Sequence, residues 1–306
     1  MMQNALFGGI NAAVLTAMNA DLSPDPDRMA THCRWLLANG CNGLAVLGTT
    51  GEANSLSITE RMTLLEALAA RGIPPAKLLP GTGTTALTDT VNLTRQAAAL
   101  GCRGALLLPP FYYKNPSDDG LFAYFSEVVQ RTGGEIKIYL YHFPQQAVVG
   151  FSVELIGRLL KAFPSVVKGV KDSSGDPANS RAYVEHYAKD GFEVYVGDDS
   201  LLLSLLKAGA AGCITAASNV NCVVGARVYA GWNTAAGEQA QLTLTATRRA
   251  VTSVPLIPGL KALVARSSGD AGWQAVRPPH LQLTAEQQAK LFSAFDACGV
   301  EMAKAA

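Results

Sequence analysis

The stretch Val166-Val167-Lys168-Gly169-Val170-Lys171-Asp172-Ser173-Ser174-Gly175 is an apolar, β-branched run that holds two lysines and ends in small polar residues. Side chains alternate faces along a strand, so Lys168 and Lys171, three residues apart, must point to opposite faces. Lys171 comes last before the loop, the end at which barrels of parallel strands carry their chemistry. An amine held there among apolar neighbours loses hydration, which favours its nucleophilic free base. Taken alone, the stretch favours the simpler interpretation that Lys171 ends the strand and reaches water.

The composition indicates a globular protein of one large domain or two smaller ones and makes several classes of partner unlikely. The chain has 306 residues, 49% of them hydrophobic, and its formal net charge is +1. No basic stripe or polybasic segment appears, so we expect no nucleic-acid and no membrane partner. The six cysteines form no CxxC pair and no zinc spacing, and the N-terminus lacks the basic region of a signal peptide. A cytoplasmic protein with reduced cysteines is the simplest account.

Short apolar runs alternate with helical patterns along most of the chain. Eight such runs predict buried strands, at residues 9–18, 43–47, 77–80, 104–108, 135–141, 166–171, 192–196 and 212–215. This alternation fits a closed (β/α)₈ TIM barrel or an open doubly wound sheet, and its length matches the barrel better. We therefore predict an α/β barrel over residues 1–230. Residues 231–306 are predicted to form a helical C-terminal extension of the same domain, in which 276–280 is a linker. Capping pairs predict helix starts at Ser57 with Glu60 and at Thr284 with Gln287.

The residues at the predicted strand ends suggest a chemistry. Besides Lys171 they are Thr49, Thr50, Tyr112, Tyr113, Tyr141, Asp198 and Asp199. The set offers an amine nucleophile, hydroxyl groups that can relay protons, and a Gly-bracketed turn whose N–H groups could hold an anion. It contains no metal-ligand cluster and no nucleotide-binding motif. The combination suits imine chemistry on a 2-oxo acid, with neither a metal nor a cofactor beyond the covalent Schiff base on Lys171.

Five motifs together resemble one known family. They are Gly48-Thr49-Thr50-Gly51-Glu52, Pro109-Pro110-Phe111-Tyr112-Tyr113, Tyr141 with Pro144, Gly169-Val170-Lys171 and Gly197-Asp198-Asp199. Their order and spacing are similar to those of the dihydrodipicolinate synthase/N-acetylneuraminate lyase family over nearly the whole chain. The resemblance implies a class I, Schiff-base-forming lyase of the pyruvate type on a (β/α)₈ barrel. It also implies a homotetramer built as a dimer of dimers.

The resemblance assigns a role to each matching residue. Lys171 matches the lysine that forms the Schiff base, and Tyr141 and Thr49 match groups of the proton relay. Tyr113 matches the relay tyrosine that dihydrodipicolinate synthases insert into a neighbouring subunit's site. The matches for binding the substrate are Thr50 and Gly51 at the carboxylate, Gly197 after the seventh strand, and Ile214 as an apolar wall near the imine.

Each of these residues also has a structural interpretation. Residues 49–51 could form an ordinary turn, with Gly51 present for a positive φ. Tyr141 could be an aromatic at the barrel edge, and Tyr112 and Tyr113 could serve packing or an interface. For Asp198 we favour the N-cap of the following helix. His142 is interpreted as a loop histidine without a partner, and the turn 81–85 as structural.

The substrate is the least determined property. Gln146 occupies the position at which dihydrodipicolinate synthases carry an arginine, and an amide cannot supply a bidentate cationic fork, although a nearby arginine could substitute. Ser200 and Ala216 replace two residues expected of N-acetylneuraminate lyases. The sequence looks more like the 2-keto-3-deoxy-sugar-acid aldolases, in which case Ser173 and Asp199 would bind the hydroxyls of the tail. The alternatives are 4-hydroxy-tetrahydrodipicolinate synthase, acting on pyruvate and aspartate semialdehyde, and a non-catalytic barrel that binds a 2-oxo acid.

Overall fold

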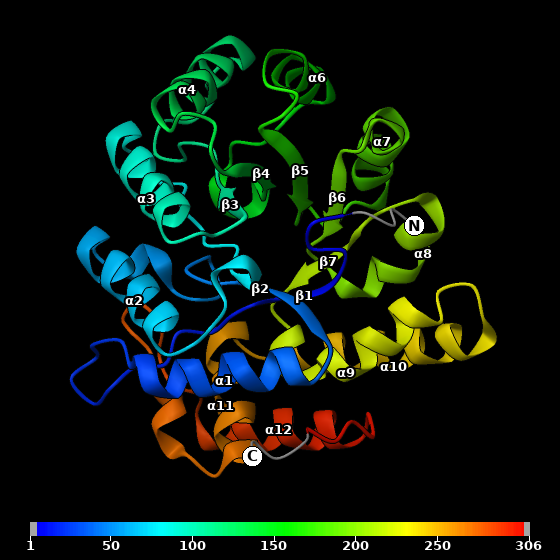
Figure 1. Cartoon of the computed structure of the whole chain (residues 1–306). Coiled ribbons are helices and arrows are strands. Elements are labelled where there is room, and N and C mark those ends of the chain that lie inside the picture. The colour runs from blue at the N-terminus through cyan, green and yellow to red at the C-terminus, as the bar shows by residue number, and fades with distance from the viewer. Residues whose placement is uncertain (1–4, 303–306) are drawn as a thin grey trace.

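The centre of the molecule is a parallel sheet surrounded by helices (Figure 1). The computed structural model describes residues 5–302, so residues 1–4, on which the signal-peptide prediction partly depends, and 303–306 lie outside it. The strands are β1 (Gly9–Ala13), β2 (Cys41–Ala45), β3 (Gly104–Leu107), β4 (Lys137–His142), β5 (Val167–Asp172), β6 (Glu193–Val196) and β7 (Gly212–Thr215). Their order in the sheet is β2-β1-β7-β6-β5-β4-β3. These strands lie within seven of the eight predicted runs or overlap them closely.

Most helices pack around the sheet, and the last helices of the chain lie farther from it. They are α1 (Pro26–Ala38), α2 (Ile58–Ala70), α3 (Leu87–Ala99), α4 (Asp118–Arg131), α5 (Pro144–Ala147), α6 (Val153–Ala162), α7 (Pro177–Tyr187), α8 (Leu202–Ala208), α9 (Ser218–Ala230), α10 (Ala235–Val251), α11 (Leu256–Ser268) and α12 (Ala285–Asp296). Figure 1 shows α11 and α12 on the side of α1 away from the sheet. No helix within residues 5–302 is both long enough and apolar enough to cross a bilayer.

The predicted strand at residues 77–80 is wrong, because this segment makes only isolated β-bridges. Pro80 has no N–H to donate to a ladder, and Lys77 belongs to a 3₁₀ turn, η2 (Pro75–Lys77). The segment nevertheless bonds to both edges of the sheet. Leu79 N–H donates to Leu44 O of β2 at 2.9 Å, and Leu106 N–H of β3 donates to Pro80 O at 2.8 Å. Residues 78–82 therefore connect the two edge strands.

The space enclosed by the strands has its own apolar cluster, closed at the amino ends of the strands. The cluster contains Phe7, Ala13, Ala45, Leu79, Leu106, Tyr139, Tyr141, Tyr195, Ala211 and Ile214. Phe7 packs edge-on against Tyr139 at a centroid distance of 5.6 Å. The buried Glu193 carboxylate accepts hydrogen bonds from Tyr139 and Tyr195 at 2.9 and 2.7 Å. Among the described residues, these side chains fill the amino end of the enclosed space.

Local sequence signals place several helix starts correctly. The predicted capping boxes are both present, with Ser57 and Glu60 opening α2 and Thr284 and Gln287 opening α12. Helix α9 was not predicted, since its small and apolar residues show no clear helical stripe. It packs against β1, α10 and α11, and Asn221 interrupts it with a non-helical φ of −130°. The burial of α9 on several sides explains the missing amphipathic pattern.

Candidate active site

Lys171 lies at the carboxyl end of β5 and is 5% exposed. Its Nζ is 4.1 Å from the centroid of the Tyr141 ring on the neighbouring strand β4, and the two residues are register partners. No carboxylate among residues 5–302 lies within ion-pair distance of this amine, which is therefore available to a ligand. Lys168 instead donates to Gly191 O at 2.9 Å, in the loop before β6. The two lysines diverge as the strand period requires.

The residues flanking Lys171 hold the end of the strand in place. The Asp172 carboxylate accepts hydrogen bonds from Asn179 and Ser180 of α7, at 2.9 and 2.7 Å. His142, at the end of β4, accepts at Nδ1 from Phe151 N–H at 2.9 Å, and burial lowers its pKa. The prediction of a loop histidine is wrong, because His142 is the last residue of β4 and is buried. Asp172 and His142 therefore bond to segments outside the sheet, which leaves the inner face to Tyr141 and Lys171.

A cavity of about 610 Å³ opens over the carboxyl ends of the strands. Six of the predicted site residues line it: Thr49, Thr50, Tyr141, Lys171, Ser173 and Gly197. Thr49 and Tyr141 also line a smaller adjoining cavity, and the two hydroxyl groups make no hydrogen bond within residues 5–302. Tyr141 stacks on Phe143 at a centroid distance of 5.7 Å, which orients its ring. The structure thus brings an amine, a phenol and hydroxyl groups to one cavity.

The loop after β2 presents backbone donors to this cavity. The N–H groups of Thr49, Thr50 and Gly51 donate no hydrogen bond within the described chain, so an anion could accept from them. Thr49 and Thr50 line the cavity, whereas Gly51 does not. Thr16 Oγ1 donates to Gly51 O at 2.7 Å and holds the turn. The proposed positive φ at Gly51 is wrong: the left-handed residues are Leu47 at 56° and Glu52 at 55°. Gly51 is required because a Cβ there would lie 2.9 Å from Val14 O.

A buried ion pair anchors the same loop. Glu52 and Lys261 of α11 are both 0% exposed, and their side chains form a salt bridge. The second Glu52 oxygen accepts from Arg277 N–H at 3.0 Å, and Lys261 Nζ also donates to Ala275 O at 2.7 Å. Burial lowers the pKa of Lys261, while Glu52 opposes that shift. The C-terminal region therefore holds the anion-binding turn. We did not predict this, because the two residues lie far apart in the sequence.

Two predicted tyrosines lie outside the cavity. Tyr113 is 78% exposed and packs edge-on against the exposed Tyr112, with ring centroids 5.3 Å apart. Neither side chain lines the cavity that holds Lys171. Ile214 is fully buried on β7 among the residues enclosed by the strands and does not line the cavity.

The outer part of the cavity differs from its predicted form. Asp199 was predicted to bind hydroxyls, but it does not line the cavity and is 1% exposed. One of its oxygens accepts from Asn221 Nδ2 at 3.0 Å, and burial raises its pKa to about 6. Asp198 does not cap the helix α8 as predicted but the short 3₁₀ turn η4 (Asp199–Leu201) before it, accepting from Ser200 N–H at 2.9 Å. Asp198 also lines the cavity, together with Gln146 and an unpredicted residue, Arg248 of α10.

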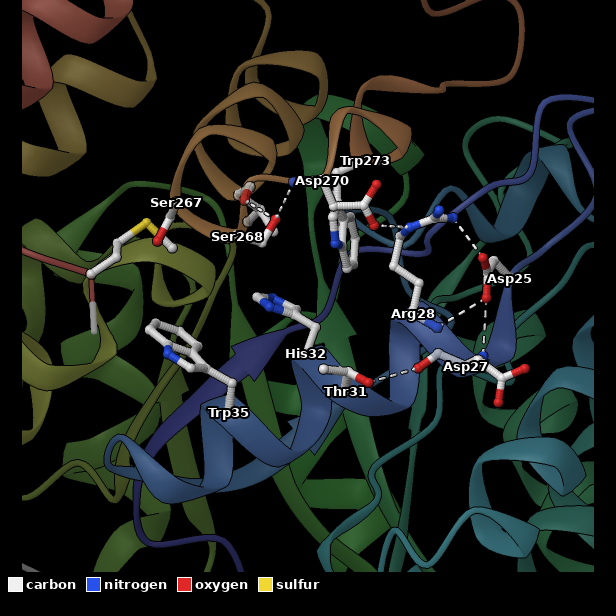
Figure 2. Close-up of a pocket in the computed structure, with 12 residues that line it drawn as sticks. Asp25, Asp27, Arg28, Thr31, His32, Trp35, Ser267, Ser268, Asp270 and Trp273 are labelled. Carbon is white, nitrogen blue, oxygen red and sulfur yellow. Dashed lines mark hydrogen bonds and ion pairs between the residues drawn. The ribbon is translucent and has the colours of Figure 1, made fainter. Parts of the chain in front are cut away.

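No three His, Cys, Asp or Glu side chains within residues 5–302 are grouped so as to hold a metal ion. A second cavity of about 420 Å³ lies between α1, α11 and the turn after α11 (Figure 2). Its Arg28 is already bound by Asp25 and Asp270. His32 makes a 3.0 Å contact with Asn219, and burial lowers its pKa to about 4. These side chains already interact with other residues of the protein, so the first cavity is the candidate active site.

A parallel sheet ringed by helices, with a buried lysine in a cavity at its carboxyl edge, defines an α/β protein with a candidate small-molecule site at that edge. The chain belongs to the dihydrodipicolinate synthetase family, whose model matches residues 6–297. This confirms the resemblance, and the family consists of pyruvate-dependent lyases and aldolases.

Individual relatives cover most of the chain. An uncharacterized DapA-like lyase of Chloroflexus aurantiacus is 35% identical over 94% of this chain and 96% of its own. A 4-hydroxy-tetrahydrodipicolinate synthase of Listeria monocytogenes is 36% identical over 68% of this chain and 71% of its own. Dihydrodipicolinate synthase from Agrobacterium tumefaciens is 33% identical, with a TM-score of 0.88 over 95% of this chain and 99% of its own. A prophage protein of the family from E. coli K12, in complex with pyruvate, gives a TM-score of 0.89 at 26% identity, over 97% of this chain and 100% of its own.

Proposed function

We propose that the protein is a class I lyase that forms a Schiff base between Lys171 and a 2-oxo acid. The Lys171 amine attacks the C2 carbonyl, a C–N bond forms, and the carbonyl oxygen leaves as water. The protonated imine then accepts the electron pair of the bond that breaks at C3, and the reverse sequence makes that bond. The observation that carries this proposal is a buried amine, free of any carboxylate, in a cavity at the end of a parallel strand.

The surrounding residues fit this reaction. The free N–H groups of residues 49–51 would bind the substrate carboxylate, with Thr50 beside them. Tyr141 lies against the amine, so its hydroxyl would transfer protons near C2, with Thr49 as the next group in the relay. No metal or separate cofactor is needed for this sequence of steps, since the imine itself is the electron sink.

For the barrel, its extension and the assembly we propose what the family resemblance implies. We propose a (β/α)₈ barrel over residues 1–230 in which residues 78–82 stand in for the third strand. Residues 231–306 extend the same domain. We further propose a cytoplasmic homotetramer, a dimer of dimers, because Tyr112 and Tyr113 form an exposed aromatic pair that a neighbouring subunit would cover. Tyr113 would then complete the proton relay of the neighbour's site.

The preferred substrates are 2-keto-3-deoxy sugar acids or related 4-hydroxy-2-oxo acids. This proposal is supported by Gln146, which lines the cavity where a cationic fork would be needed for a second carboxylate. The alternative is 4-hydroxy-tetrahydrodipicolinate synthase activity on pyruvate and aspartate semialdehyde. The names of several curated relatives favour that alternative.

Reduction with borohydride tests the proposed chemistry directly. In the presence of pyruvate, the protein should gain the mass of a reduced pyruvate adduct on Lys171, and Lys171→Ala should gain none. The matched control is Lys168→Ala on the same strand, which should still form the adduct because its amine reaches Gly191 O instead of the cavity. Absence of an adduct with pyruvate and with other 2-oxo acids would refute the lyase proposal and favour a binding protein.

A further inference from the structure

Arg248 and Asp198 form a charged pair on the outer wall of the candidate active site. Arg248 lies in the last turn of α10, and Asp198 follows β6. Arg248 Nε lies 3.7 Å from Asp198 Oδ1 and 3.9 Å from Asp199 Oδ1, with side-chain exposures of 20% for Arg248 and 30% for Asp198. Both Arg248 and Asp198 line the cavity. These separations allow an ion pair but are too long for hydrogen bonds.

The pair keeps hydrogen-bonding capacity on both partners. Asp198 Oδ1 accepts from Ser200 N–H at 2.9 Å and from the Ser200 hydroxyl at 2.7 Å, but Asp198 Oδ2 accepts no hydrogen bond within the described chain. The Arg248 guanidinium likewise donates none within residues 5–302. A free acceptor and several free donors therefore lie side by side at the cavity wall.

The charges around Arg248 select against a second carboxylate. Arg248 is one cation between two carboxyl groups, of which Asp199 has its pKa raised to about 6 by burial and so is mostly ionised at neutral pH. A carboxylate on the ligand could accept from Arg248, but the neighbouring aspartates would repel it. A hydroxyl group carries no charge and both donates and accepts, so it matches Arg248 and Asp198 together.

The rest of the outer wall is consistent with a hydroxylated ligand. Ser173, Gln146, Asn54 and Ser55 are neutral hydrogen-bonding residues that line the same cavity. Several neutral polar groups suit several hydroxyls along a chain. We propose that the Arg248–Asp198 pair binds adjacent hydroxyl groups on the tail of the substrate, beyond the carbon at which the bond is made or broken. This inference rests on the proposed Schiff-base function.

The test compares three substrates that differ in their tails: 2-keto-3-deoxygluconate, 4-hydroxy-2-oxopentanoate and 4-hydroxy-2-oxoglutarate. The unmodified enzyme should prefer the hydroxylated tail. Arg248→Met should lower kcat/KM for 2-keto-3-deoxygluconate roughly 10–100-fold, mainly through KM, because hydrogen bonds to a charged group are lost. It should change kcat/KM for 4-hydroxy-2-oxopentanoate, which lacks the tail hydroxyls, less than about threefold. The control Arg249→Met alters the exposed neighbour on α10 and should leave all three values unchanged.

A second variant keeps the test decisive if Arg248→Met unfolds. Asp198→Asn retains an N-cap side chain while removing the negative charge, so its thermal unfolding should be close to that of the unmodified protein. It should lower kcat/KM for 2-keto-3-deoxygluconate and raise kcat/KM for 4-hydroxy-2-oxoglutarate. The inference is overturned if both variants affect all substrates equally, or if the unmodified enzyme prefers 4-hydroxy-2-oxoglutarate or pyruvate with aspartate semialdehyde. Exchange of the pyruvate methyl protons separates the two proposals: intact exchange with the wrong tail preference refutes only this one, and absent exchange refutes both.

Discussion

Two charged pairs at the cavity differ in how far their hydrogen-bonding groups are already used. The inner pair is Glu52 with Lys261, beside the turn at residues 49–51, and the outer pair is Arg248 with Asp198. At the inner end, Glu52 and Lys261 are fully buried, bound to each other and to backbone groups, and they hold the turn that presents free N–H groups. At the outer end, Arg248 and Asp198 are partly exposed, 3.7 Å apart, and each keeps unused hydrogen-bonding groups. A saturated pair positions the backbone, whereas an unsaturated pair can bind a ligand. Under the proposed function, the carboxylate end of the substrate would be held by a rigid site and the tail by a selective one.

The largest effect should come from breaking the inner pair. Lys261→Met leaves the Glu52 charge buried without its partner, so the free energy of unfolding should fall by about 3–5 kcal/mol. The same change should slow formation of the pyruvate adduct, because the turn at residues 49–51 loses its anchor. Chemical denaturation and borohydride trapping measure the two effects. The control Lys290→Met removes an exposed lysine of α12 and should change neither.

A double variant shows whether the buried charge is the cause. Glu52→Gln together with Lys261→Met removes both charges and should recover much of the lost stability, since an amide can still accept from Arg277 N–H. If the double variant is as unstable as Lys261→Met alone, the cost comes from packing and the contrast between the two pairs is lost.

A smaller effect is expected beside the outer pair, and it depends on pH. Burial raises the pKa of Asp199 from 3.8 to about 6, so the folded state binds this proton more tightly than the unfolded state. The stability from Asp199 is therefore present below pH 3.8 and is lost as pH rises through about 6, an amount of about 3 kcal/mol. The Asp199→Asn variant has no titrating carboxyl group at this position, so it does not lose this stability as the pH rises. The stability of Asp199→Asn relative to the unmodified protein should increase between about pH 4 and pH 7 in denaturation experiments. A pH-independent difference would contradict the raised pKa.

The smallest effect should come from crowding the outer wall. A Cβ at Gly197 would lie 2.0 Å from Ser173 Oγ and 2.8 Å from Ser173 Cα, so Gly197→Ala must displace Ser173. Overpacking of this kind costs roughly 1–3 kcal/mol. Thermal unfolding should show the loss, and KM for a hydroxylated substrate should rise. The comparison is Gly48→Ala, where no atom lies within 4 Å of the added Cβ, and its melting temperature should stay unchanged. Equal melting temperatures for the two variants would show that Ser173 can move without cost.

Part of the fold and of the site could be predicted because it depends on local rules. The period of two along a strand separated Lys168 from Lys171, and the capping residues located the starts of α2 and α12. The same local reasoning failed at residues 77–80, where the apolar pattern predicts a strand but Pro80 and the 3₁₀ turn at Lys77 prevent a regular ladder. It failed again at Gly51, because close approach to Val14 O, rather than a positive φ, requires the glycine there.

The sequence by itself determined which residues lie at the carboxyl ends of the strands, because the spacing of apolar residues predicts the alternation of strands and helices. Lys171, Tyr141 and the turn 49–52 were found in that way. Only the tertiary structure decided that Asp199 is buried against Asn221, that Lys261 reaches Glu52, and that Arg248 faces the cavity. These facts depend on how α9, α10 and α11 pack against the strand ends. No local period encodes a contact between side chains separated by dozens or hundreds of residues.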